Sequence, residues 1–273
     1  MRRKRLTEIF PFLLPLRRKQ RIFCVHLKML LDKNKYSKTI IEKKLDNLIF
    51  SDKSTLINPN TGMDIIYQYN KVHNLKLASK TMNGLIIKPG EIYSFNFLVK
   101  NAEKHGKYKD GLIDMDDKLV ADKGGGICQL SNILFWVFLH GDLKIIERHG
   151  HGKMDFPYPE DGVPEGTDAT VSEGWLDLQV KNETDKTYQI IIDFDDQCMQ
   201  VSLYCDVESE NDIKVIAKDG YYFRRGEGVY RRCSLVKQDY KKETGELVKE
   251  VHLYDNECEI GYEVNYEEIR EEM

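Results

Sequence analysis

Apolar residues follow a helical spacing in the first third of the chain. Between residues 17 and 31 they recur every three or four positions, which predicts a helix. A loop rich in turn residues at 58–62 precedes a second segment with helical spacing, and this segment ends near Asn83-Gly84. Residues 85–95 then read as two short strands around a Pro-Gly turn.

The middle and the end of the chain combine one apolar helix with a series of strands. A Gly-rich loop at 123–126 leads into the apolar run Ile127–His140, which predicts a helix that Gly141 ends. Alternation and β-branched residues predict strands at 143–147, 170–180, 188–194 and 199–205, followed from residue 213 by shorter segments with turns at Lys218-Asp219-Gly220 and Arg225-Gly226.

This order of elements predicts an α+β fold, with a helical N-terminal part, a central helix that starts at the Gly-rich motif, and mostly antiparallel strands after it. We divide the chain of 273 residues into three parts. They are a basic helical region at 1–60, a core domain at 61–205, and a β-rich C-terminal extension at 206–273 that packs on the core.

Charge is near balance over the whole chain but uneven along it. A net charge of −4 argues against a protein built to coat nucleic acid. The N-terminus is strongly basic, which suits either contact with an anionic membrane surface or a solvated docking arm. No segment is long and apolar enough for a transmembrane helix. The apolar run at 9–16 is broken by two prolines and followed by Arg17-Arg18-Lys19, so we expect no export signal and a cytoplasmic location, with the inner membrane face as an alternative.

The six cysteines form no CxxC pair, and without an export signal we expect them to be reduced. Most would be small buried apolar residues. We expect no cofactor and no resident metal ion.

Cys128 stands out because it follows Gly124-Gly125-Gly126-Ile127 at the predicted start of the central helix. Glycines allow close backbone approach and positive φ angles. The free N–H groups and the positive end of the helix dipole favour a thiolate, and both can lower the pKa of the cysteine. The same N–H groups can serve as an oxyanion hole. A buried cysteine under a Gly-rich turn is the structural alternative.

Possible partners for Cys128 follow in the order of papain- and transglutaminase-like sites. His149 and His151 come after the strand at 143–147, and two residues apart they share one face of an extended chain. Asp168 heads the next predicted strand. In such a site the imidazole accepts the thiol proton, and the carboxylate orients the imidazole.

The same four side chains also include the ligand types of zinc, so a zinc-dependent hydrolase is a rival interpretation. We rank it second because a Gly-rich helix start suits a nucleophile better than a metal ligand. Arg148, beside the histidines, is a candidate for pairing with a substrate carboxylate, and an ordinary salt bridge is the alternative.

The motifs together resemble the VanW family. The residues that carry this resemblance are Pro89-Gly90-Glu91 with Tyr93-Ser94-Phe95-Asn96, Gly124-Gly125-Gly126-Ile127-Cys128-Gln129-Leu130-Ser131, Glu147-Arg148-His149 with His151, and Asp168-Ala169-Thr170-Val171. The resemblance extends over most of the chain.

The resemblance implies an accessory role in glycopeptide (vancomycin) resistance. Exported relatives act as L,D-transpeptidases that cross-link peptidoglycan stem peptides through a cysteine. It therefore implies Cys128 as nucleophile, His151 as base with His149 as the alternative, and Asp168 as the orienting acid. The residues that would bind substrate are Gly124, Gly125, Gly126, Gln129, Ser131 and Arg148.

Two functions therefore stay open at this stage. One is a cysteine acyl-transfer enzyme acting on peptidoglycan stem peptides or their precursors. The other is a non-catalytic module that binds those precursors.

Overall fold

The computed structural model describes residues 10–115, 118–154, 162–265 and 269–271. The fold is α+β, as the sequence predicts. The helical elements are η1 (Pro11–Leu13), α2 (Leu14–Leu31), α3 (Ile66–Ser79), α4 (Phe95–Val99), η2 (Ala102–His105) and α5 (Cys128–Leu139).

The strands are gathered in four sheets. Two four-stranded sheets have the orders β1-β4-β9-β7 and β2-β11-β10-β3, a five-stranded sheet has the order β15-β12-β13-β14-β8, and β5 and β6 form a hairpin. Their bounds are β1 (Lys35–Tyr36), β2 (Asn47–Thr55), β3 (Ile86–Ile87), β4 (Glu91–Ser94), β5 (Asp110–Met115), β6 (Lys118–Lys123), β7 (Leu143–Glu147), β8 (Lys153–Met154), β9 (Gln179–Asn182), β10 (Tyr188–Phe194), β11 (Cys198–Cys205), β12 (Asn211–Arg225), β13 (Gly228–Lys241), β14 (Leu247–Ile260) and β15 (Ile269–Glu271).

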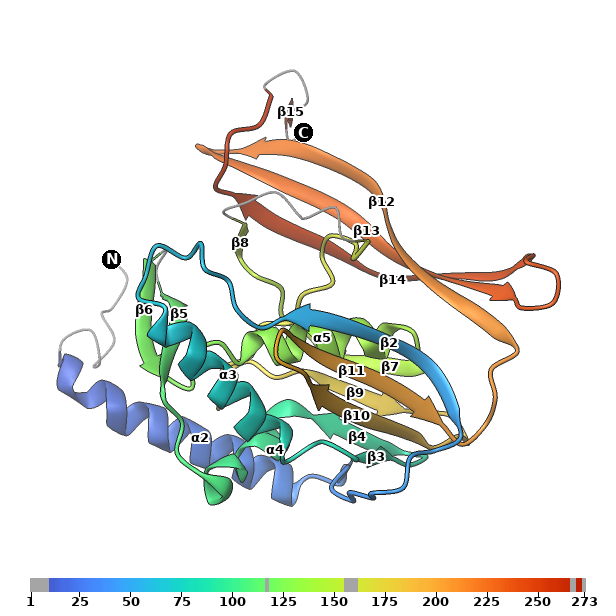
Figure 1. The fold of residues 1–273 in the computed structure, drawn as a ribbon. Coiled ribbons are helices and arrows are strands. Elements are labelled where there is room, and N and C mark those ends of the chain that lie inside the picture. The colour runs from blue at the N-terminus through green and yellow to red at the C-terminus, as the bar shows by residue number, and fades with distance from the viewer. Residues whose placement is uncertain (1–9, 116–117, 155–161, 266–268, 272–273) are drawn as a thin grey trace.

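The helix α5 lies at the centre of the fold. Nine of its twelve residues are buried, including the consecutive run from Ile133 to Leu139. Such a helix needs apolar neighbours on every side, and the main core cluster combines its side chains with residues of α3, β10 and β11. Figure 1 shows α5 in the middle of the molecule, beside β2 and β11.

The C-terminal sheet is fixed to this core at both ends of α5. Beyond the last turn of the helix, Lys237 of β13 donates hydrogen bonds to the Gly141 carbonyl at 2.7 Å and to Asp142 at 3.0 Å. On the side of the helix start, the Tyr254 hydroxyl donates to the Gly166 carbonyl at 2.8 Å. Figure 1 shows the long strands β12, β13 and β14 above the rest of the molecule.

Several predicted elements are confirmed, and the differences have local causes. The helix at 17–31, the central helix and the strands 143–147 and 188–194 match α2, α5, β7 and β10. The single strand predicted at 170–180 is wrong: a tight turn at Gly174, bridged by Ser172 and Leu176, interrupts it, and regular pairing starts only at Gln179.

The turn predicted at Lys218-Asp219-Gly220 is also wrong. The strand β12 continues through it with a bulge, at which Asp219 has a φ of 54°. An Asp-Gly pair serves a bulge as well as a hairpin turn because both require a positive φ. The turn at Arg225-Gly226 does connect β12 to β13, and Gly226 has a φ of 61°.

Candidate functional site

Cys128 is the first residue of α5, and three glycines place it against the β5–β6 hairpin. Gly124 and Gly126 have φ angles of 77° and 88°, which side chains rarely adopt. Gly125 lies against Gly111, and a Cβ on Gly125 would be 2.2 Å from the Gly111 carbonyl carbon. The chain can therefore pass between the hairpin and the helix only with glycine at these positions.

The segment 168–171 runs along the first two turns of α5. Asn132 accepts a hydrogen bond from the Ala169 amide at 2.8 Å, and the Ser131 hydroxyl donates to the Ala169 carbonyl at 2.5 Å. The Cys128 thiol donates to the Val171 carbonyl, with a sulfur–oxygen distance of 3.6 Å. The segment runs opposite to the helix, so Val171 lies at Cys128 and Asp168 lies near the second turn, where its charge still acts on the thiol.

Burial raises the pKa of the Cys128 thiol, and the nearby charge of Asp168 raises it further. The hydrogen bond to the Val171 carbonyl does not reverse this direction. The expectation of a lowered pKa at the helix start is therefore wrong, because the first turn of α5 is covered by the segment 168–171. At neutral pH the resting side chain is a thiol, so any reaction at sulfur requires a base.

Asp168 holds the site together through both carboxylate oxygens. Oδ2 accepts hydrogen bonds from the His151 ring at 2.6 Å and from the His151 amide at 2.5 Å, while Oδ1 pairs with Arg148 at 2.8 Å. Burial alone would raise the pKa of Asp168, but the hydrogen bond from His151 and the charge of Arg148 lower it below its usual value. The carboxylate stays ionised and fixes Nδ1 of the imidazole.

The other histidine turns elsewhere. His149 Nε2 lies 2.9 Å from a carboxylate oxygen of Glu147, at the end of β7. The His149 carbonyl accepts a hydrogen bond from the Thr170 amide at 2.7 Å. The two imidazoles thus pair with different carboxylates and do not present a joint H-x-H face. Among the described residues no group of three or more His, Cys, Asp or Glu side chains is placed to hold a metal ion.

Arg148 is fully engaged by the protein. Its guanidinium donates to the Asp168 carbonyl, to the Gly166 carbonyl and to Asn256 of β14, in addition to the ion pair with the Asp168 carboxylate. It also stacks over the Tyr254 ring at 4.9 Å. This side chain ties the C-terminal sheet to the site and is the structural salt bridge that the sequence left as an alternative.

Gln129 and Ser131 follow Cys128 on α5 but face different surroundings. The Ser131 side chain is fully buried, and its hydroxyl is occupied by the Ala169 and Cys128 carbonyls. The Gln129 amide donates to Ser54 at 2.7 Å and to the Thr55 carbonyl at 2.6 Å, at the end of β2. Its oxygen is buried and has no hydrogen-bond partner among the described residues.

A cleft of about 520 Å³ adjoins this arrangement. One wall is the end of β2, from Asp52 to Thr55, and the other is the part of α5 from Gln129 to Trp136, together with the loop that ends at Asp168. Trp136 lines the cleft and donates its indole N–H to Asp52 at 2.8 Å. The volume of the cleft suits a small peptide or a drug-sized molecule. The residues that line it are Asp52, Lys53, Ser54, Thr55, Gln129, Asn132, Ile133, Trp136, Val163, Thr167 and Asp168.

Sequence reasoning missed Lys71 of α3. Its aliphatic stem packs on Gly126, so closely that a Cβ on that glycine would lie 2.2 Å from Lys71 Cγ. Burial lowers the pKa of the Lys71 amine to about 8. No ion pair of Lys71 is found within the described part of the chain. No motif marks this residue, because it comes from a helix about 55 residues before the cysteine.

Comparisons with known proteins cover this part of the chain. The family model described as "VanW like protein" matches residues 70–204, which include the Gly-rich loop, Cys128, both histidines and Asp168. The chain is 47% identical to the Vancomycin B-type resistance protein VanW of Enterococcus faecalis over 262 residues, which are 96% of this chain and 95% of that protein. It is also 35% identical over 114 residues to the uncharacterised protein YoaR of Bacillus subtilis, which are 42% of this chain and 36% of that protein.

The structure thus defines an α+β protein with a cysteine at the start of a buried helix and a hydrogen-bonded aspartate–histidine pair at the head of the segment that packs along this helix. No solved structure matches the chain. The extent and identity of the match to the Enterococcus faecalis protein show that the chain belongs to the VanW family.

Proposed function

We propose that the protein is an accessory factor of vancomycin resistance that acts as a cysteine acyl-transfer enzyme on peptidoglycan stem peptides or their precursors. The resistance role is supported by the name and near-complete coverage of the Enterococcus faecalis relative. The observations that support the chemistry are the packing of the segment 168–171 on α5, the hydrogen bond between Asp168 and His151, and the effect of the Asp168 charge on the Cys128 thiol.

The proposed reaction begins with proton transfer. With Nδ1 of His151 bonded to Asp168, Nε2 is the basic nitrogen that takes the proton of the Cys128 thiol. The sulfur then attacks a peptide carbonyl of the stem, the C–N bond breaks, and the leaving amine receives the proton from the imidazolium. An acceptor amine attacks the resulting thioester, the C–S bond breaks, and the thiol forms again.

Separate parts of the site have separate tasks in this proposal. The backbone N–H of Cys128 stabilises the oxyanion, because the next three N–H groups of α5 already donate to the Gly126 and Ile127 carbonyls. The cleft between β2 and α5 holds the peptide, with the exposed side chain of Lys53 available to its polar groups. Gly125, Ser131 and Arg148 position these groups and do not contact the substrate.

Intact-mass spectrometry after incubation with a tetrapeptide stem tests the proposal. The wild type should gain the mass of the acyl group, and Cys128→Ala should not. Cys24→Ala is the matched control, because Cys24 is an exposed cysteine on α2 and its loss should leave the adduct unchanged. Identical spectra for the wild type and Cys128→Ala would overturn the assignment.

A second pair of variants tests the base. His151→Gln should lose acylation, while His149→Gln, whose ring bonds to Glu147, should retain most of it. The opposite result would transfer the role of base to His149.

The raised pKa of Cys128 favours one second candidate, a binding module that uses the cleft without covalent chemistry. In that case Cys128→Ala should bind stem peptide as tightly as the wild type in calorimetry, with no adduct in either protein. Binding without an adduct in the wild type would favour the module over the enzyme.

A further inference from the structure

The helix α2 packs on the body of the protein with one face only. Met29 is buried on that face, and Ile22 and Val25 are half-buried. Ile22 lies so close to Gly174 that a Cβ on that glycine would be 2.8 Å from its Cγ1. The spacing of three and four residues between these side chains is that of a single helix face. No helix in the described residues is long and apolar enough to cross a membrane.

The opposite face of α2 is also apolar, and it is exposed. Leu16, Phe23, Leu27 and Leu30 follow one another at intervals of seven, four and three residues, so they form one stripe along the helix. Phe12 of η1 precedes the stripe and is 76% exposed, and the four members of the stripe are between 40% and 69% exposed. An exposed stripe of large apolar side chains marks an interaction surface.

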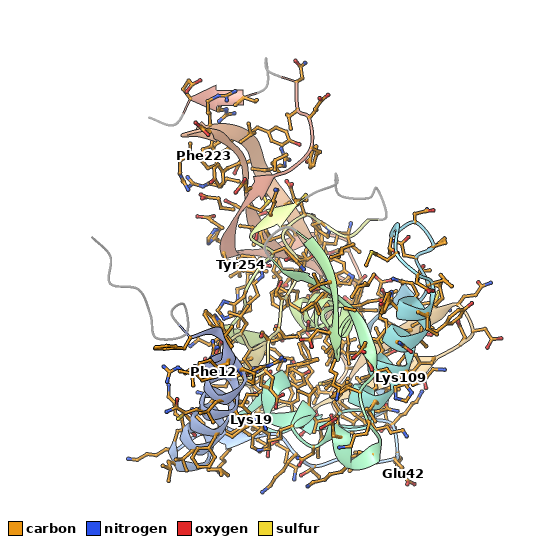
Figure 2. The ribbon with its side chains drawn as sticks, turned by 90° about the vertical axis from the view of Figure 1, so that its left-hand side faces the viewer. Phe12, Lys19, Glu42, Lys109, Phe223 and Tyr254 are labelled. Carbon is orange, nitrogen blue, oxygen red and sulfur yellow. The ribbon has the colours of Figure 1, made fainter. Side chains whose placement is uncertain are left out.

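The charges around the stripe have one sign. Arg17, Lys19 and Lys28 are exposed on α2, together with Arg18, and the segment from residue 9 to residue 31 contains no aspartate or glutamate. Three basic side chains of α2 contact the body: Arg18 pairs with Asp122, Arg21 stacks over Trp175, and His26 lies 3.7 Å from a carboxylate oxygen of Glu173. Figure 2 shows Phe12 and Lys19 beside the blue helix α2, below the C-terminal sheet.

We propose that α2 binds in the plane of an anionic lipid bilayer, with the stripe Leu16–Phe23–Leu27–Leu30 inserted among the acyl chains. The basic side chains beside the stripe lie at the level of the anionic headgroups. A helix with an apolar face and a purely cationic flank fits this partner, because acyl chains match the stripe and headgroups match the charge. This surface is separate from the cysteine site and does not depend on the proposed reaction.

Vesicle co-sedimentation of the full chain tests the proposal. The protein should sediment with vesicles of equal parts phosphatidylcholine and phosphatidylglycerol, and much less with phosphatidylcholine alone. Phe23→Ser with Leu30→Ser should abolish binding. The matched control is Leu247→Ser with Val248→Ser, two exposed apolar residues of β14, which should bind like the wild type.

The charge requirement has its own pair of variants. Arg17→Gln with Lys19→Gln should weaken binding roughly thirtyfold at low salt, since each basic residue near an anionic surface contributes on the order of 1 kcal/mol. Lys242→Gln with Lys249→Gln, exposed in and before β14, removes the same charge elsewhere and should change little.

Three results would overturn the proposal. One is equal binding to neutral and anionic vesicles. Another is an equal loss of binding in the α2 variant (Phe23→Ser with Leu30→Ser) and in the β14 control (Leu247→Ser with Val248→Ser). The third is a protein that does not bind vesicles but forms a dimer in light scattering, with Phe23→Ser and Leu30→Ser restoring the monomer. That result would assign the stripe to a second copy of the chain.

Discussion

Replacing Lys71 by methionine should make the protein more stable at neutral pH. The Lys71 stem packs on Gly126, and burial lowers the pKa of the amine from 10.5 to about 8. At about 1.4 kcal/mol for each pKa unit, this fall corresponds to about 3 kcal/mol. The side chain is partly exposed, so solvent screens part of the cost, and we expect a gain of about 1.5 kcal/mol. Methionine keeps the length and the apolar contacts of the stem.

The gain should depend on pH with a defined sign. Below about pH 8 the folded protein carries the charged amine of Lys71 at a cost. As the pH rises from 8 towards 10.5, the folded state loses this proton before the unfolded chain does, and the wild type gains stability. The advantage of Lys71→Met should therefore be largest at neutral pH and disappear above pH 10.5.

Urea unfolding of both proteins at neutral pH and near the upper end of this window measures the effect. Lys80→Met is the control, because Lys80 is exposed at the C-cap of the same helix and its replacement should change stability by less than about 0.5 kcal/mol. A variant less stable than the wild type at neutral pH, or an advantage that grows with pH, would refute the reasoning.

Two further predictions concern the frame around the site. Gly125→Ala should lower the stability measured by thermal unfolding by about 1–3 kcal/mol, because its Cβ would collide with Gly111. Gly152→Ala is the control and should be nearly neutral, because no atom lies within 4 Å of its Cβ. Equal effects of the two substitutions would contradict the close approach of Gly125 to Gly111. Burial lowers the pKa of His140 to about 4, so the stability that it contributes is complete above pH 6.5 and is lost as the pH falls through 4. Urea unfolding between pH 6.5 and pH 4 measures the free energy of unfolding of the wild type and of His140→Gln. Over this range the variant should lose up to about 3 kcal/mol less stability than the wild type. An equal dependence of stability on pH in both proteins would contradict this.

The sequence predicted those elements whose pattern decides their position by itself. The apolar run that forms α5 is buried on all sides, and β10 is a run of buried residues with one exposed position, so both have unmistakable patterns. The strand β2 was missed because its exposed and half-buried residues carry no regular alternation. Its place is set by pairing with β11, about 150 residues later in the chain, which no local pattern records.

The candidate site was predicted in composition but not in detail. The Gly-rich motif identified Cys128, and the order of residues identified Asp168. The residue pattern left both His149 and His151 open, because they share one face of an extended chain, and only the family resemblance favoured His151. The choice depends on which imidazole meets the Asp168 carboxylate, and that follows from tertiary packing. The raised pKa of Cys128 was also missed, since the covering segment 168–171 comes from a distant part of the sequence.

Asp168 acts on Cys128 in two opposing ways, which yields a prediction that separates chemistry from structure. Its charge raises the pKa of the thiol, while its hydrogen bond orients the proposed base, His151. In Asp168→Asn, made in a Cys24→Ala background, iodoacetamide should alkylate Cys128 faster than in the parent, roughly twofold, because more thiolate is present. Acylation by the stem peptide should instead fall on the order of a hundredfold, because the imidazole loses its orientation. If both rates fell together, Asp168 would act only by maintaining the fold. If acylation were unchanged, the proposed Cys-His-Asp site would be wrong. Opposite changes in the two rates require that the same carboxylate restrains the thiol at rest and directs the base during the reaction.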